Sequence, residues 1–518
     1  MSDRIEPGHI EPNHIEPVGD DYPVDENEAA APKAKITAKS AAIVGVRVVA
    51  GTVGIAVALA TIAGATFLPI PTVGTTPASV DVTPVPTAQQ LVCPGALLRL
   101  GDETGQSATT ASPIGTPTVR FGSTSGGDDV SVSPLQQSDA GTAGTESAPI
   151  QLRSTVGGDD DLVAGAQSQV PDTGEFDGLA TADCAGVATE TWLVGGSTSV
   201  GRTTLITLAN PSDTVSTVSL AISSEDGAVT APGITGIVVQ PHGQRVLPLA
   251  GFAPGVESPV VHVTSRGGQI VANLQQTTVR GIEAGGVDFV GAGHTPSTTQ
   301  VIPGVRVTNT DALQSRLGEE GYGDLASVLR VLVPGDEETM VEVTVTSDDG
   351  AAAGTAFSVD LDAGVVDDLA LDGLVDGTYT VHITASHPIV AGARVSTVAP
   401  SAPEGEAPGS DFVWLSTVNA LNDRALVSIA SGPGSRVNLV NPTDVDAEVT
   451  LEATDGDDVT LTVPAEGAAH ADVAEGDTYL VTGFDRLYGS VSYASDAQVS
   501  GYAIQPPAAS AEAITIFP

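Results

Sequence analysis

Aromatic and basic residues are scarce in this 518-residue chain. Phe, Trp and Tyr make up 3% of it, and 19 Lys and Arg stand against 64 Asp and Glu, a formal net charge of -45. Nucleic acid binding needs a basic footprint, so we expect no nucleic acid partner. All the lysines lie before residue 40, which excludes a Walker A loop or a Schiff-base lysine in the rest of the chain.

Recognisable catalytic and metal-binding motifs are also missing. The sequence has no G-x-S-x-G elbow, and the histidines after residue 68 form no H-x-x-x-H or H-E-x-x-H pair. We therefore predict no catalytic, cofactor-binding or metal-binding residues and a non-enzymatic protein. A carbohydrate-active envelope enzyme, or its accessory subunit, is the alternative, because the many acidic residues leave a carboxylate pair open.

One apolar run is long enough to cross a membrane. Residues 48–68 carry no charge, and at about 1.5 Å per residue they span roughly 31 Å. The positive-inside rule places the N-terminus in the cytoplasm and the C-terminal bulk outside. The basic residues that flank the run on its N-terminal side are Lys33, Lys35, Lys39 and Arg47. We predict a disordered cytoplasmic tail at 1–47 and a single transmembrane helix, a signal anchor, at 48–68.

A cleaved signal peptide is the competing interpretation of this run. Ala63-Gly64-Ala65 has the small-x-small pattern of a cleavage site. The apolar region of a signal peptide is usually about 7–15 residues, shorter than this one, so we prefer the anchor. A Pro/Thr-rich stretch at 69–92 follows and predicts an extended stalk.

Three prolines mark an internal repeat. Pro211, Pro334 and Pro442 each have apolar residues five and three positions before them and seven, nine and eleven positions after them. Alternation with period 2 on both sides of a turn predicts two half-buried strands joined by a hairpin-like loop. The residues after the turn that we expect to face inward are Val218, Leu220, Ile222, Val341, Val343, Val345, Val449, Leu451 and Ala453.

The repeats and the abundant turn residues predict a mainly β fold. We expect tandem immunoglobulin-like β-sandwich units after the transmembrane helix, at residues 191–295, 296–405 and 406–518. Separate units and a single assembly both fit the pattern. The leucines between 311 and 326 predict one short helix in the connector ahead of the Pro334 repeat of the second unit.

Other conspicuous residues have two readings each. Trp192 and Trp414 open the first and third units and could stack on sugars, but their apolar neighbours favour burial. Acidic turns at 126–130 and 157–162 could hold calcium, as could Asp455, Asp457 and Asp458, yet none forms an EF-hand loop. His262 and His382 alternate with apolar residues at equivalent strand positions, which predicts exposed repeat positions.

Cys93 and Cys184 bound a Gly/Ser/Asp-rich segment at 93–190, here named the Cys-bounded segment. Both cysteines lie outside the membrane under the predicted topology, in a compartment where thiols oxidise. Two cysteines allow one intrachain pairing. We therefore predict a Cys93–Cys184 disulfide that ties together the ends of a segment too polar to form its own core.

Several motifs occur together in this chain: the stalk after one span, Cys93-Pro94-Gly95, Cys184 shortly before Trp192-Leu193-Val194-Gly195-Gly196, and the Asn-Pro-Ser-Asp and Asn-Pro-Thr-Asp hairpins. In these motifs, over roughly residues 91–518, the chain resembles an uncharacterised family, of the domain-of-unknown-function kind, of secreted or membrane-anchored proteins of high-GC Gram-positive bacteria. The family implies a location and no activity. We expect a membrane-anchored extracytoplasmic protein that binds or scaffolds at the cell envelope, with envelope proteins or glycans as candidate partners.

Overall fold

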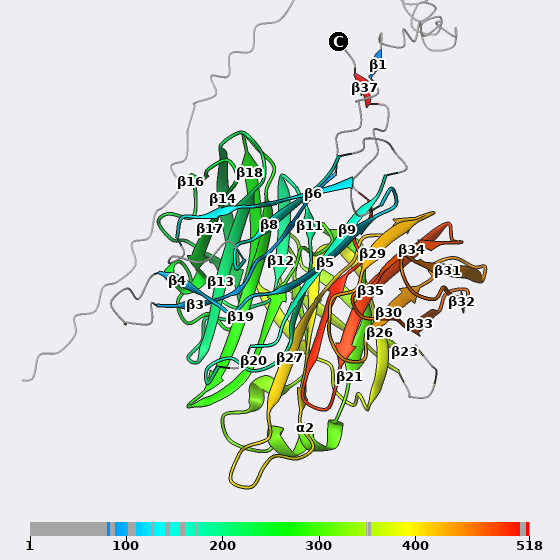
Figure 1. Ribbon diagram of the computed structural model, residues 1–518. Helices are drawn as coiled ribbons and strands as arrows, with labels where there is room; N and C mark the ends of the chain where they lie inside the picture. Colours follow the sequence, from blue (N-terminus) through cyan, green and yellow to red (C-terminus); the bar gives the residue numbers. More distant parts are fainter. Residues whose placement is uncertain are drawn as a thin grey trace, which may run out of the picture. The chain divides into compact units, whose positions relative to one another are not determined.

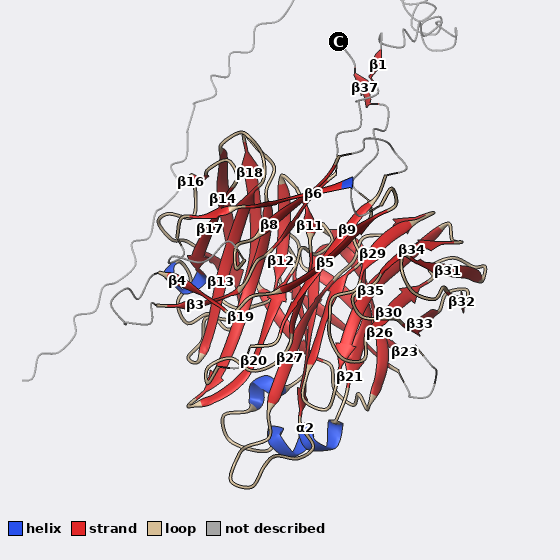
Figure 2. Cartoon of the chain, in the orientation of Figure 1, coloured by secondary structure: helices blue, strands red, loops and turns tan. Residues whose placement is uncertain are grey.

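Strands make up most of the regular structure in the computed structural model of this protein, and α2 (Thr310–Leu317) is the one α-helix among the described residues (Figures 1 and 2). The mainly β prediction is confirmed, and so is the short helix. No helix in the described part is long and apolar enough to cross a membrane. The predicted tail (1–47), the transmembrane helix (48–68) and most of the stalk lie outside the described residues. The structure describes residues 80–82, 89–101, 110–126, 129–139, 146–155, 161–171, 173–348, 350, 354–507 and 514–516.

The first unit is a sandwich of two antiparallel sheets around an apolar core. One sheet has the order β12-β18-β14, with β15 and β16 beside β14, and the other has the order β20-β19-β13-β17. Aliphatic side chains from both sheets form one buried cluster between them. The strands are β12 (Glu190–Val194), β13 (Arg202–Asn210), β14 (Ser216–Ser224), β15 (Gly227–Val229), β16 (Ile237–Val239), β17 (Gly243–Pro248), β18 (Val260–Arg266), β19 (Val271–Arg280) and β20 (Glu283–Val290).

The second unit repeats this strand order with one strand shared between its sheets. The 22 residues of β26 pair first with β21 and β23 and then with β22 and β27. This single strand therefore occupies the sheet positions that β18 and β19 occupy in the first unit. The strands are β21 (Ser297–Val307), β22 (Val328–Leu332), β23 (Thr339–Ser347), β24 (Thr355–Leu361), β25 (Val366–Ala370), β26 (Gly377–Val398) and β27 (Ser410–Ser416).

The third unit has the same order again, β29-β34-β31-β32 against β36-β35-β30-β33. A short strand, β28, also pairs with β35. The strands are β28 (Leu421–Asn422), β29 (Ala425–Ser428), β30 (Arg436–Val440), β31 (Ala447–Ala453), β32 (Val459–Val463), β33 (Ala468–Asp472), β34 (Thr478–Thr482), β35 (Arg486–Ala494) and β36 (Val499–Ala503).

Two expectations about these units change. The first two strands of each unit lie in different sheets, whereas the immunoglobulin order ABED over CFG keeps them in one. The units are two-sheet sandwiches with an order of their own. The third unit also does not begin at residue 406. Strand β27 pairs with the end of β26 and therefore belongs to the second sandwich.

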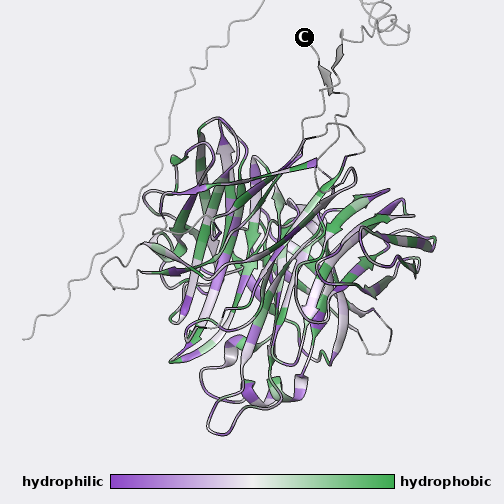
Figure 3. Cartoon of the chain, viewed as in Figure 1, coloured by the Kyte–Doolittle hydropathy of each residue, from purple (hydrophilic) through white to green (hydrophobic). Residues whose placement is uncertain are grey.

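The predicted inward positions after the prolines are confirmed. Those on β14 and β23, together with Val449 and Leu451 on β31, are at most 3% exposed, and Ala453 is half-buried. In Figure 3 the hydrophobic residues colour these strands in an interrupted pattern, as alternation requires. Asn210 stabilises the first turn by donating its amide to the carbonyls of Thr214 and Val239 at 2.7 and 3.1 Å. Asn441 makes the same pair of bonds in the third unit.

The Cys-bounded segment is folded, contrary to our expectation that it could not form a core. It contributes a four-stranded sheet, a three-stranded sheet and a hairpin. Val130, Leu152 and Val163 pack around the joined cysteines. The strands are β2 (Gln90–Cys93), β3 (Leu97–Leu100), β4 (Ala111–Ile114), β5 (Thr118–Ser123), β6 (Val130–Pro134), β7 (Gln136–Gln137), β8 (Ile150–Ser154), β9 (Val163–Gln169), β10 (Ala180–Asp183) and β11 (Ala185–Gly186).

The end of the predicted stalk also differs from expectation. Leu91 and Val92 lie in β2, which pairs with β8 on one side and β11 on the other, so residues 90–92 belong to the folded body. Earlier in the stalk, β1 (Val80–Val82) pairs with β37 (Ile514–Ile516). The start and the end of the described chain therefore meet in one short ribbon.

A cluster of arginines joins the first and second units through Asp324, which the short helical connector supplies. The Asp324 carboxylate accepts two hydrogen bonds from Arg280, at 2.8 and 2.9 Å, and one ion pair from Arg202 at 2.7 Å. Arg394 lies 3.9 Å away. Burial opposes ionisation of Asp324, but Arg280, Arg394 and Arg202 outweigh it and hold its pKa below the usual value.

Replacing Asp324 is expected to destabilise the junction between these units. In Asp324→Ala, Arg202, Arg280 and Arg394 lose their shared carboxylate, and breaking such a buried network costs roughly 3 kcal/mol. Urea unfolding followed by circular dichroism should show an earlier transition. Asp336→Ala, in an exposed turn, is the matched control and should unfold like the parent. Equal midpoints for both variants would contradict this role of Asp324.

Candidate functional site

The last strands of the three units, β20, β27 and β36, meet in one junction. There β27 lies against both β20 and β36, and β10 of the Cys-bounded segment also lies against β20 and β36. Polar side chains fasten this junction to backbone N–H groups of the neighbouring strand. Asp288 accepts from the Trp414 N–H at 2.7 Å. Asp411 accepts from the N–H groups of Leu179 and Val499 at 2.9 and 3.2 Å, and Ser500 accepts from the β10 backbone at 2.9 Å. The three units therefore form one assembly, which settles the alternative left open by the sequence.

Two of these side chains are fully buried carboxyls. Burial raises the pKa of Asp288 well above its usual value, opposed by the Trp414 N–H and reinforced by the charge of Asp411. Burial likewise raises the pKa of Asp411, opposed by the N–H groups of Leu179, Val499 and Phe412. Both groups favour the protonated form more than an exposed aspartate does.

Beside this junction lies a groove of about 1240 Å³, here named the groove. Its walls come from the Cys-bounded segment, the first unit and the third unit, which are far apart in the sequence. Cys184 stands in one wall, so the disulfide holds part of the lining in place. The polar residues of the lining include Gln89, Gln90, Glu190, Gln269, Asn419, Asn422, Asp423, Arg424 and Gln505.

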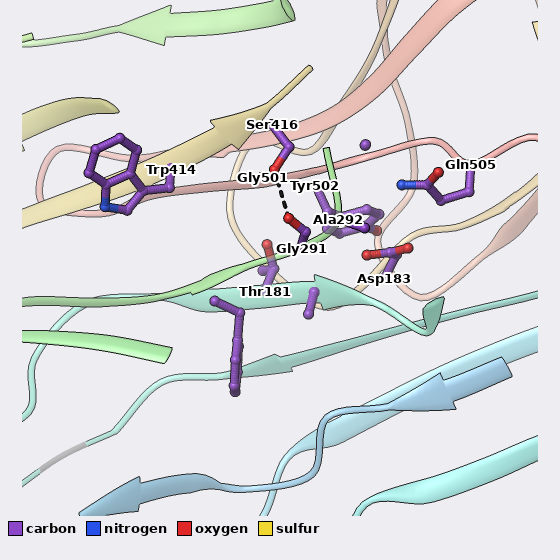
Figure 4. Close-up of a pocket in the computed structure, with 12 residues that line it drawn as sticks. Thr181, Asp183, Gly291, Ala292, Trp414, Ser416, Gly501, Tyr502 and Gln505 are labelled. Atoms are coloured by element: carbon purple, nitrogen blue, oxygen red, sulfur yellow. Dashed lines mark hydrogen bonds between the residues drawn. The ribbon is translucent and has the colours of Figure 1, made fainter. Parts of the chain in front are cut away.

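Asp183, at the end of β10, faces both the groove and a small cavity of about 20 Å³ that adjoins it. The cavity has room for about one water molecule. In Figure 4, Asp183, Tyr502 and Gln505 gather toward one end of this cavity and Trp414 lies toward the other. The Oδ2 atom of Asp183 is buried and has no hydrogen-bond partner among the described residues. Burial raises the pKa of Asp183 to about 7, opposed by its own backbone N–H.

Free strand edges are the second feature of the groove. Six strands that supply lining residues, β10, β11, β12, β28, β29 and β36, pair along one side only within the described part of the chain. A single bridge between Trp192 and Gly293 interrupts the edge of β12. Side chains already bond some backbone groups on these edges, as Ser500 does on β10 and Tyr502 does on β29. The other backbone donors and acceptors of an edge can pair with another chain.

A model of a family of unknown function (DUF5719) matches residues 139–479, about two thirds of the chain. The chain belongs to this family. The matched region runs from within the Cys-bounded segment to β34, so it holds the first two units and most of the third. The expectation of an uncharacterised family is confirmed to this extent. A search of curated proteins gave no match.

The conspicuous aromatic residues of this DUF5719 protein are buried, as predicted. Trp414 is 2% exposed, donates its indole N–H to Gln276 at 2.8 Å and stacks under Arg330. Trp192 is 8% exposed and stacks on His262 with ring centroids 4.0 Å apart. His262 and His382 are half-buried and so less exposed than the alternation suggested.

The predicted disulfide is present, with Cys93 bonded to Cys184. Among the residues that the structure describes, no three His, Cys, Asp or Glu side chains gather so as to hold a metal ion. Residues 127–128 and 157–160 of the acidic turns lie outside this part. Asp183 and Asp411 were not identified as site residues from the sequence. The only signal in the sequence was an acidic residue within a strand of small residues, as in Ala180-Thr181-Ala182-Asp183.

We expect Asp183→Asn to stabilise the DUF5719 protein at pH 8. A carboxyl whose pKa rises on folding stabilises the native state fully below the unfolded pKa, near 3.8, and loses that contribution as pH rises toward about 7. The variant should therefore melt higher than the wild type at pH 8, and the gap should narrow markedly at pH 5. Differential scanning calorimetry at both pH values measures it. Asp423→Asn, at an exposed turn, should show no such gap; equal behaviour would contradict the assignment.

Proposed function

We propose that this protein is a membrane-anchored extracytoplasmic protein that binds or scaffolds components of the cell envelope through the groove. The groove is the observation that carries the proposal. Its volume of about 1240 Å³ exceeds the roughly 300–1,000 Å³ typical of small-molecule sites. Three parts of the chain must meet to build it, and a disulfide supports one wall.

Location rests on the sequence and on the cysteines. The apolar run at 48–68, with basic residues on its N-terminal side, supports an anchor with the β units outside the cytoplasm. A structural disulfide is common outside the cytoplasm and rare within it. We propose the same extracytoplasmic location for the related proteins of the family, and we propose that they occur in high-GC Gram-positive bacteria. We describe the units as immunoglobulin-like only in the broad sense of two-sheet antiparallel sandwiches.

Protease protection tests the topology. Protease added to intact, wall-stripped cells is expected to degrade the chain beyond about residue 69 and to leave a membrane stub that carries the N-terminal tail. Protection of the β units in intact cells would contradict the proposed topology. Release of the β units into the medium, with an N-terminus near Thr66, would replace the anchor by a cleaved signal peptide.

Photo-crosslinking in living cells tests binding. A benzophenone amino acid at Asn422, an exposed residue of the groove lining, should capture an envelope component. The same group at Ser358, exposed on β24 and away from the lining, is the control and should capture none. Equal capture, or none at Asn422, would contradict the proposed function.

A further inference from the structure

The groove combines strand edges that have no second paired strand among the described residues with Asp183, whose Oδ2 atom is buried. We propose that it binds an extended peptide segment with a basic side chain, which pairs its main chain with a strand edge and places its cationic group on Asp183. This inference rests on the function proposed above and names the class of the partner.

The walls suit a polypeptide backbone. Edge strands such as β12 and β29 have a paired strand along one side only within the described part of the chain, and addition of a strand to such an edge is a common mode of peptide recognition. Small residues line much of the groove and let a second backbone approach closely. They include Ala164, Gly165, Gly186, Ala292, Gly293 and Ala503.

The aromatic residues of the lining argue against a sugar as the ligand of the groove. Trp192 and Tyr502 are 8% and 7% exposed. The Trp192 ring is stacked on His262, and the Tyr502 hydroxyl donates to the Ser428 carbonyl at 2.8 Å. Neither presents a ring face of the kind on which sugars stack.

The charged residues of the groove lining favour a partner with a basic side chain. Among the described residues of the lining, Asp183, Glu190 and Asp423 are acidic and Arg424 alone is basic. Glu190 already accepts from Trp192 at 3.2 Å and pairs with His262 at 2.9 Å. Asp183 retains a buried oxygen with no partner among the described residues, and a cation beside it would favour its ionised form. The chain's net charge of -45 attracts cations as well.

A bead-bound library of random decapeptides, screened with the full chain in detergent, provides the probe. Enriched peptides are expected to share a Lys or Arg at one position. The affinity of an enriched peptide should fall at least tenfold when that residue becomes Ala, when alternate amides are N-methylated, or when the protein carries Asp183→Asn. Asp336→Asn, which changes an exposed carboxyl outside the lining, is the matched control and should change the affinity less than twofold.

Site and ligand class are checked separately. Ala420→Trp fills the lining from a half-exposed loop position and should abolish enrichment. Three results would overturn the inference. Enrichment could survive Ala420→Trp, the enriched peptides could share no basic residue, or the wild type could enrich no peptide. Binding of N-acetylglucosamine hexasaccharide in place of peptides would also overturn it. Crosslinking at Asn422 to a glycan would leave the proposed function standing and refute only the peptide, whereas no crosslinking would refute the function itself.

Discussion

Val343→Asp is expected to unfold the second unit. Val343 lies at the centre of β23, is 0% exposed, and sits between Ile383 and Phe357 in the sheet register. An aspartate there would bury a charge with no partner, at a cost of about 4 kcal/mol or more. Urea unfolding and protease digestion should both show loss of this unit at concentrations that leave the wild type folded.

Met340→Asp is the matched control on the same strand. Met340 is 58% exposed on the opposite face and pairs with Asp360. The new charge stays in water, so we expect a loss below about 1 kcal/mol even with a like charge across the strands. If the two variants unfold together, the inward register of β23 is wrong.

Removing both cysteines is expected to produce the second large effect. The Cys93–Cys184 bond closes a loop with a sequence separation of 91, and chain-entropy arguments give roughly 4–5 kcal/mol for such a loop. The small core around the cysteines, with Val130 and Leu152, cannot replace that contribution alone. Cys93→Ser combined with Cys184→Ser should therefore make the Cys-bounded segment sensitive to protease while the second unit stays resistant.

Reductant provides the control for this experiment. Dithiothreitol should sensitise the wild type in the same way and leave the double serine variant unchanged. Alkylation of the native protein without reductant should label no cysteine, since the structure describes no free thiol. Two labelled cysteines would contradict the bond.

The sequence by itself determined the local structure of this protein. Alternation with period 2 identified the strands on either side of Pro211, Pro334 and Pro442 and their inward residues, because one face of each strand must leave water. The leucines near residue 313 indicated α2. The even number of cysteines and their predicted location in an oxidising compartment indicated the disulfide bond. Each of these inferences needs only neighbouring residues or a unique pair.

Tertiary structure alone decided which strands share a sheet and what the sheets enclose. Pairing of β12 with β18, or of β27 with β26, joins residues tens of positions apart, and many registers satisfy the same alternation. The contact of three terminal strands buries Asp411 and leaves Asp183 facing a groove with walls from three segments. Burial and shared edges arise only when those segments meet, so no short stretch of sequence could have revealed the groove.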